Sequence, residues 1–156
     1  MIIREHKPED REAIEKCIAE FNKEERVYTP HFWVDYDVSK PYFDYLNKKI
    51  SEGNGKIFVA VEEGNIVGYV AVKMEVEDSP RNVIKKYGYI SNVMILKEHR
   101  GKGFGEALVK KAEEFTKESG ANNISLDVQV GNSAINLYHK LGYKECTVWM
   151  EKKIDE

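Results

Sequence analysis

Hydrophobic and polar positions recur along the chain with two periods, which predict alternating strands and amphipathic helices. The first strand is expected over residues 2–5. Pro8 then suits the first turn of a helix whose apolar positions recur at i, i+3, i+4 and i+7, namely Ile14, Cys17, Ile18 and Phe21. The pattern dissolves over residues 22–38, and Ser39 is expected to cap a second helix that runs to about residue 51.

The rest of the chain continues this alternation. Two Val-, Ile- and Tyr-rich strands joined by Glu63-Gly64-Asn65 predict a hairpin. The expected elements are strands over 56–62, 66–76 and 87–96, a helix over 103–119, a strand over 124–130, a short helix over 132–141 and a last strand over 143–153. Hairpin strands followed by β-α-β units predict the α/β (α+β) class, with a mixed sheet and helices on both faces.

Composition narrows the class of protein. The 156 residues fit a single domain over 1–156. With 24 basic and 27 acidic residues the net charge is -3, which argues against nucleic-acid binding through bulk charge. Cys17 and Cys146 lack metal-ligand spacing and are expected to be buried thiols, so no metal is expected. No long apolar run or secretory pattern is present, so we expect no membrane span and a cytoplasmic protein.

A glycine-rich loop follows the strand over 87–96 and opens the next helix, with the sequence Arg100-Gly101-Lys102-Gly103-Phe104-Gly105. Free amides at a helix start favour an anion, and glycines let a ligand approach the backbone, so the loop predicts a phosphate-bearing ligand. The P-loop pattern is absent, and Glu106 stands where a dinucleotide loop needs its third glycine. A tight turn without a ligand is the open alternative.

Two motifs together resemble the GNAT superfamily of acyl-CoA-dependent N-acetyltransferases. Arg100-x-x-Gly103-x-Gly105 is similar to the Q/R-x-x-G-x-G/A signature of that family. The second motif comprises Leu126-Asp127-Val128, Asn132, Ala134, Leu137-Tyr138 and Leu141-Gly142-Tyr143. The resemblance is best over residues 55–150, the expected acetyl-CoA-binding core, and residues 8–52 would supply the acceptor-side helices.

The resemblance implies a mostly antiparallel, twisted sheet with a central parallel strand pair that splays apart. The pantetheine arm of acetyl-CoA would pair with the backbone of Val93, Met94 and Ile95 in that opening. Contacts to the pyrophosphate are implied for Arg100, Gly101, Lys102, Gly103, Phe104, Gly105 and Glu106. Asn132, which can also cap the short helix, would contact the pantetheine, and Asn136 would lie near the cofactor.

The resemblance also implies catalytic roles. Tyr138 would donate a proton to the departing CoA thiolate, although its place on an apolar helix face also suits a core residue. An ammonium has no lone pair, so a general base is required, and Asp127 aligns with an acidic position of related enzymes. Glu75 and Glu77 are alternative bases. A backbone amide near Met94 or Ile95 would hold the oxyanion.

The acceptor is expected beside the aromatic and acidic stretch 22–38, where Tyr28, Phe32, Trp33 and Asp35 are the candidate contacts. Aromatic faces and carboxylates favour a cationic amine. A patch that covers the sheet, or a dimer contact, would explain the same residues.

The sequence thus predicts an enzyme that transfers acetyl from acetyl-CoA directly to a primary amine of a small molecule or peptide. A non-catalytic CoA-binding module with the same fold is the alternative, and a nucleotide-binding module is disfavoured by the loop. An antiparallel edge at the C-terminus could support a homodimer.

Overall fold

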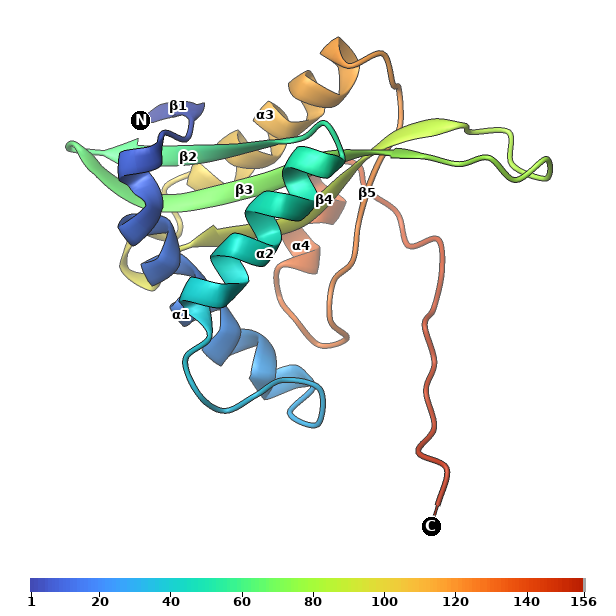
Figure 1. Cartoon of the computed structure of the whole chain (residues 1–156), viewed down its shortest axis with the longest axis horizontal. Coiled ribbons are helices and arrows are strands. Elements are labelled where there is room, and N and C mark those ends of the chain that lie inside the picture. Colours follow the sequence, from blue (N-terminus) through green and yellow to red (C-terminus); the bar gives the residue numbers. More distant parts are fainter. Residues whose placement is uncertain (156) are drawn as a thin grey trace.

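The computed structural model describes residues 1–155 and shows a five-stranded sheet between two layers of helices (Figure 1). The elements in chain order are β1 (Ile2–Glu5), η1 (Pro8–Asp10), α1 (Arg11–Tyr28), α2 (Ser39–Glu52), β2 (Lys56–Glu62), β3 (Asn65–Val76), β4 (Lys86–Ile95), η2 (Lys97–His99), α3 (Phe104–Glu118), β5 (Ile124–Leu126) and α4 (Ile135–Lys140). The strands lie in the order β1-β2-β3-β4-β5, and only β4 and β5 are parallel. The predicted mixed, mostly antiparallel sheet is confirmed.

Each face of the sheet buries its own apolar core. The helices α1 and α2 cover one face, where Ile14, Ile18 and Leu46 pack against Val59 and Tyr69. The helices α3 and α4 cover the other face, where the buried residues include Val70, Ile90, Phe104, Leu108 and Tyr138. Because strand side chains alternate between faces, the nearly continuous apolar runs of β2 and β3 are explained by burial on both sides.

A charged contact fixes the entry into α1. Both carboxylate oxygens of Asp10 accept hydrogen bonds from the Arg4 guanidinium, at 2.7 and 3.0 Å, and Oδ2 also accepts one from the Lys7 amide at 2.7 Å. The Arg4 hydrogen bonds hold the pKa of Asp10 below its usual value, against the effect of burial. The strand β1 is thereby tied to the start of α1.

The parallel pair of strands parts after three residue pairs. The pairs are Gly88 with Ile124, Tyr89 with Ser125, and Ile90 with Leu126, where β5 ends. The strand β4 continues to Ile95 with only β3 beside it in the sheet. A register shift at Ala71/Val72 leaves Ser91 as an extra residue of β4 at the point of divergence. The splayed opening that the resemblance implies is therefore present.

Some boundaries differ from the sequence-based expectations. The helix α1 continues to Tyr28, because Lys, Glu and Arg are good helix formers even where no apolar periodicity marks them. Ser39 is the first residue of α2 and not its cap; its amide donates to Asp37 Oδ1 at 2.9 Å instead. The predicted strand over 124–130 is confined to β5, and the short helix begins at Ile135.

The prediction of a last strand over 143–153 is wrong for this structure. The segment leaves the domain after α4 and runs outward (Figure 1). An alternating pattern specifies side-chain faces, but a strand also needs a neighbour with free backbone groups, and none lies beside this segment in the described chain. Cys146 is consequently exposed, contrary to expectation, whereas Cys17 is buried as predicted.

Candidate active site

The loop between β4 and α3 presents a row of free backbone amides. Gly101 and Gly103 adopt left-handed conformations, with φ of 78° and 87°. The first backbone hydrogen bond into α3 runs from the Ala107 amide to the Gly103 carbonyl, at 3.1 Å. Over the described residues, no hydrogen-bond acceptor is found for the amides of residues 101–106. This arrangement suits an anion at the positive end of the α3 dipole.

The two cations of the loop are already paired with carboxylates. Arg100 donates from Nε to the Ile95 carbonyl at 2.9 Å and from its guanidinium to Glu24 at 2.8 Å. Lys102 Nζ lies 3.0 Å from Glu62 Oε1, and His99 Nδ1 lies 2.6 Å from Glu62 Oε2. These contacts lower the pKa of Glu62, with the larger effect from Lys102 and the smaller from His99. The attraction for an anion therefore comes chiefly from the backbone, while Arg100 links the loop to β4 and α1.

Gly105 allows α4 to pack against the start of α3. A Cβ atom at this position would lie 3.3 Å from Leu137 Cδ2 and 3.9 Å from Ile95 Cγ1. Glu106 lies between Lys110 and Lys140, at 2.7 and 2.8 Å, and these lysines lower its pKa to about 2. The helix α4 is thereby held beside the end of β4 and the amide row.

Tyr138 is buried on the inner face of α4, with 7% of its surface exposed. Its ring packs edge-on against Tyr143, with centroids 5.9 Å apart. The pKa of Tyr138 is raised to about 12, mainly by burial and to a smaller extent by the charge of Glu25. The phenol therefore keeps its proton at neutral pH, as a proton donor must.

Glu25 is a site residue that the sequence interpretation missed. Its Oε1 accepts a hydrogen bond from Asn132 Nδ2 at 3.3 Å, and the carboxylate is half-buried. Burial raises the pKa of Glu25, which is the direction expected of a general base that works near neutral pH. In the sequence it lies among Lys23, Glu24 and Arg26, and nothing in such a charged run separates it from solvated neighbours.

Asn132 lies in the turn before α4 and does not cap the helix as predicted, because the N-cap residue is Ala134. Its Oδ1 accepts a hydrogen bond from the Ala134 amide at 2.9 Å, just before α4 begins. Its amide group therefore holds α4 through Oδ1 and Glu25 through Nδ2. Asn136 is exposed on the outer surface of α4.

The carboxylates proposed as bases from the sequence have other partners. Asp127 Oδ2 accepts a hydrogen bond from the Tyr89 hydroxyl at 2.6 Å. Glu75 Oε1 lies 2.8 Å from Lys73 Nζ, and Glu77 accepts a hydrogen bond from the Ser79 amide at 3.0 Å. In contrast, the charge of Glu25 contributes to the raised pKa of Tyr138.

The cofactor contacts expected on β4 and α3 lie around the opening. Val93, Met94 and Ile95 form the part of β4 beyond the last pair with β5. The side chains of Met94 and Phe104 are buried in opposite cores, so only their backbone groups remain for a ligand.

The acceptor-side candidates form an exposed aromatic group after α1. The ring centroid of Phe32 lies 6.4 Å from that of Trp33, and Trp33 Nε1 donates to Thr29 Oγ1 at 2.7 Å. Tyr28 and Asp35 are also exposed. The side chain of Tyr28 approaches Gly131, next to Asn132.

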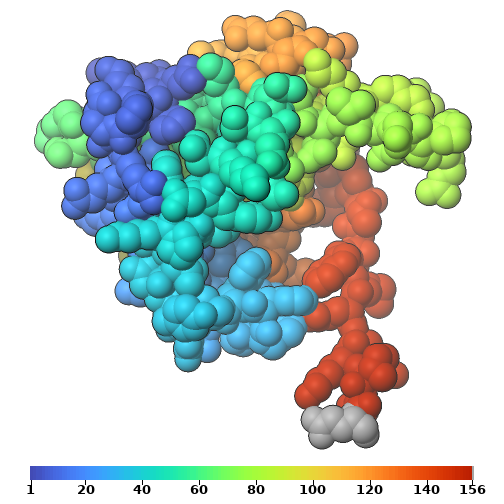
Figure 2. All heavy atoms as spheres, viewed as in Figure 1, coloured from blue at the N-terminus to red at the C-terminus, as the bar shows by residue number. Residues whose placement is uncertain are grey.

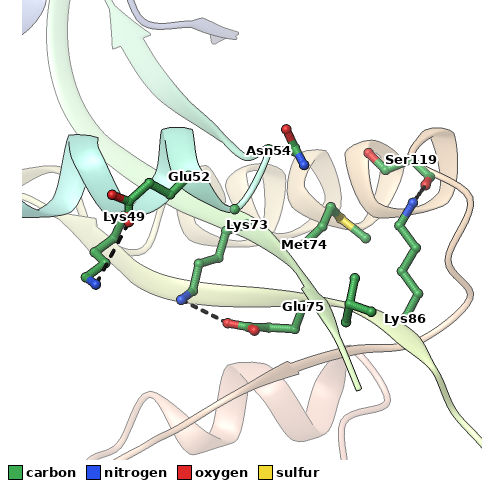
Figure 3. A pocket seen from close by; sticks show the side chains of 10 residues that line it. Lys49, Glu52, Asn54, Lys73, Met74, Glu75, Lys86 and Ser119 are labelled. Atoms are coloured by element: carbon green, nitrogen blue, oxygen red, sulfur yellow. Dashed lines mark hydrogen bonds and ion pairs between the residues drawn. The ribbon is translucent and has the colours of Figure 1, made fainter. Parts of the chain in front are cut away.

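Two hollows lie on the α2 face of the sheet. The larger, of about 660 Å³, lies between the end of α2, the end of β3 and the start of β4, where Lys73 pairs with Glu75 and Lys86 donates to the Ser119 carbonyl (Figure 3). It is therefore at the opposite end of β4 from the amide row. The smaller, of about 350 Å³, lies beside the bulge at Ser91 and is lined by Tyr42, Tyr45, Leu46, Lys49, Lys73 and Tyr89.

Among the helices of residues 1–155, none combines the length and the hydropathy that a membrane-spanning segment needs.

The sheet thus opens between its two parallel strands beside a loop of free amides. The chain belongs to the Acetyltransferase (GNAT) family, whose sequence profile matches residues 16–143.

Three similar proteins illustrate the relationship. The chain is 35% identical over 115 residues to an N-alpha-acetyltransferase of Sulfurisphaera tokodaii. The aligned region covers 69% of this chain and 67% of that protein. A structure from Pyrococcus furiosus assigned as an acetyl transferase is 32% identical, with a TM-score of 0.78 over 98% of this chain and 99% of that one. An assigned acetyltransferase from Clostridium acetobutylicum, solved with acetyl-CoA, has a TM-score of 0.71 at 19% identity over 97% and 95% of the chains.

Proposed function

We propose that this protein transfers an acetyl group from acetyl-CoA directly to a primary amine. The observation that carries the proposal is the parting of β4 from β5 beside the free amides of residues 101–106. One ligand with an anionic diphosphate and a long amide-bearing arm would satisfy both features.

The loop has the space that such a ligand needs. A Cβ atom built at Gly101 has no neighbour within 4 Å, and one built at Gly103 meets only Met1 Cε, at 3.7 Å. The diphosphate would rest on these amides, and the amide groups of the pantetheine arm would pair with β4 from Val93 to Ile95. The Clostridium acetobutylicum protein with the same fold was solved with acetyl-CoA, which supports this assignment.

The reaction needs one base and one acid. Glu25 removes a proton from the acceptor ammonium, the amine nitrogen bonds to the thioester carbon, and the carbon–sulfur bond breaks as the tetrahedral intermediate collapses. Tyr138 donates its phenolic proton to the departing thiolate. The new amide nitrogen then loses its extra proton, which restores the phenol, and Glu25 releases its proton to water. Backbone amides near Met94 and Ile95 stabilise the oxyanion.

A covalent acyl-cysteine is not part of this mechanism. Burial raises the pKa of Cys17 to about 12, so that residue is not a thiolate at neutral pH. Cys146 lies in the C-terminal segment that extends from the domain.

The acceptor we favour is the α-amine of a peptide or protein. The Sulfurisphaera tokodaii relative is an N-alpha-acetyltransferase, which supports this class of acceptor. The exposed aromatic rings at Phe32 and Trp33, with Asp35 nearby in the chain, offer a surface for an extended cationic chain end.

A thiol-release assay with acetyl-CoA tests the proposal against a panel of N-terminal peptides, polyamines, amino acids and aminoglycosides. We expect turnover with peptides, confirmed by a mass increase of one acetyl group on the α-amine. Acetyl-CoA binding in calorimetry without turnover on any amine would instead support the non-catalytic module.

A further inference from the structure

The smaller hollow on the α2 face lies where β4 parts from β5. Its volume is about 350 Å³, and its lining comes from α2, β3 and β4. Tyr89 and Ser91 line it from β4, and Ile90 between them is the last residue of β4 that pairs with β5. Figure 2 shows this face of the molecule, with α2 in front and no other described segment lying over it. The hollow is therefore accessible from solvent and adjoins the opening between β4 and β5.

Two ammonium groups line the hollow, and the described residues that line it include no carboxylate. They belong to Lys49 on α2 and Lys73 on β3, and Figure 3 shows the two side chains extending in the same direction. Lys73 Nζ lies 2.8 Å from Glu75 Oε1, and an ammonium has three N–H donors, so this contact leaves donors for a second partner. Lys49 Nζ lies 4.0 Å from Glu52 Oε2, which is too far for a hydrogen bond. Both lysines can therefore donate to a ligand in the hollow.

The aromatic rings of the hollow already carry these two cations. Lys49 Nζ lies 5.8 Å from the ring centroid of Tyr45, and Lys73 Nζ lies 5.8 Å from the ring centroid of Tyr89. Aromatic faces attract cations, so a cationic ligand would compete with two resident ammonium groups for the same rings. It would also be repelled by their charges, whereas an anion would be attracted. The hollow therefore favours an anionic group.

The strand β4 relates the hollow to the proposed site of transfer. Ser91 stands three residues before Met94, near which the oxyanion would be held. At about 3.3 Å per residue, the hollow lies roughly 10 Å along the strand from the reacting carbon. When the α-amine of an extended peptide is at that carbon, the side chains of its second and third residues reach about this far. One of these two side chains would therefore enter the hollow.

We propose that the hollow binds the carboxylate of an Asp or Glu side chain at the second or third residue of the acceptor peptide. The carboxylate accepts hydrogen bonds from the ammonium groups of Lys49 and Lys73, and the tyrosine rings of the lining pack against the peptide. These two lysines are thus specificity-determining residues. The inference rests on the proposed function, because it requires the α-amine of a peptide at the opening between β4 and β5.

Kinetics with matched peptides test the inference. The peptides share one sequence and differ only in having Glu, Gln or Lys at the second or third residue. With the full chain and saturating acetyl-CoA, we expect kcat/KM for the better Glu peptide to exceed that for its Gln counterpart roughly fivefold, with the Lys peptide poorer still. Because both lysines are partly exposed, the preference should shrink as salt is added.

Variants of the two lysines connect the preference to the hollow. Lys49→Gln combined with Lys73→Gln should bring the Glu and Gln peptides to equal kcat/KM, and Lys49→Glu combined with Lys73→Glu should favour the Lys peptide. Lys49→Arg combined with Lys73→Arg retains both charges and should retain the preference. Lys48→Gln is the matched control, because Lys48 lies on α2 outside the hollow, with 75% of its side chain exposed, and this variant should behave as the parent does.

Calorimetry with the same peptides in the presence of CoA separates this inference from the proposed function. Equal kcat/KM for the Glu and Gln peptides, or a preference that survives in the double Gln variant, would overturn the inference while acetyl transfer still stands. Tighter binding of the Glu peptide that the double Gln variant loses, without turnover of any peptide, would support the role of the hollow and refute the transfer. Equal binding of all peptides without turnover would overturn both.

Discussion

Asn132 donates a 3.3 Å hydrogen bond to Glu25, and this contact joins α1 to the turn before α4 across 107 positions of the chain. The same asparagine accepts the Ala134 amide, so one side chain positions both the base that we propose and the helix that carries Tyr138. The turn before α4 and the position of the proposed base are therefore coupled.

Replacing Glu25 by Gln should remove the base while it preserves the shape of the side chain. We expect turnover to fall about 100-fold or more, the usual contribution of a general base. In the parent enzyme, activity should rise with pH through the raised pKa of Glu25, and the variant should lack that rise. Asp127→Asn is the matched control: loss of the pH dependence in that variant, and not in Glu25→Gln, would assign the base to Asp127.

The same variant should not lose stability. Because the folded pKa of Glu25 is raised by burial, the stabilisation from its neutral form is fully present below the unfolded pKa and is lost as the pH rises through the folded value. At neutral pH the ionised carboxylate therefore costs stability, and Gln avoids that cost. A melting temperature for Glu25→Gln equal to or above that of the parent at pH 7, with any difference shrinking toward pH 4, is the expected result.

Replacing Tyr138 by Phe should reduce turnover without weakening acetyl-CoA binding. The ring would still fill the core, but no proton would be available for the thiolate, so kcat should fall about 100-fold or more. Tyr143→Phe is the control, because the hydroxyl of that neighbouring ring donates to Glu113 at 3.0 Å, away from the proposed reaction. Steady-state kinetics and calorimetry separate the two effects, and unchanged kcat in Tyr138→Phe would remove this residue from the mechanism.

Replacing Gly103 by Val should weaken acetyl-CoA binding. The substitution adds a side chain over the free amides and forces a β-branched residue to a φ of 87°, at a cost of about 2 kcal/mol. Gly64→Val is the matched control, since Gly64 has a φ of 81° in the β2–β3 turn, with no neighbour within 4 Å of its Cβ position. Both variants should lose similar stability, but only Gly103→Val should raise the dissociation constant in calorimetry; equal affinities would contradict the diphosphate assignment.

Replacing Asp10 by Ala should destabilise the fold by about 2 kcal/mol, because Arg4 and the start of α1 lose charged hydrogen bonds. The folded pKa of Asp10 is lowered, so its contribution is present above the ordinary value of 3.8 and is lost as the pH falls through the folded pKa. Denaturant unfolding at pH 7 and pH 3 should show the difference between parent and variant shrinking in acid. Asp44→Ala, which removes an exposed partner of Arg11, should change stability little at either pH.

Local patterns predicted much of the architecture because strand and helix formation depend on spacing within a few residues. The hairpin of β2 and β3, the helix α3 and the glycine loop are found where the apolar period, the turn residues and the loop motif indicate them. The failure at 143–153 has a different origin. Its side chains have the pattern of a strand, but pairing depends on a neighbour, and the neighbour is not encoded nearby in the chain.

The amino-acid sequence by itself determined the order of the elements as far as α4, the family and the amide loop at the mouth of α3, because each depends on short-range spacing and on glycine at defined positions. Only the tertiary structure decided that Glu25 faces Asn132, that Gly105 admits Leu137, and that Arg100 is held by Glu24. These relationships join residues from different elements, and the burial that raises the pKa of Glu25 exists only once those elements have packed together.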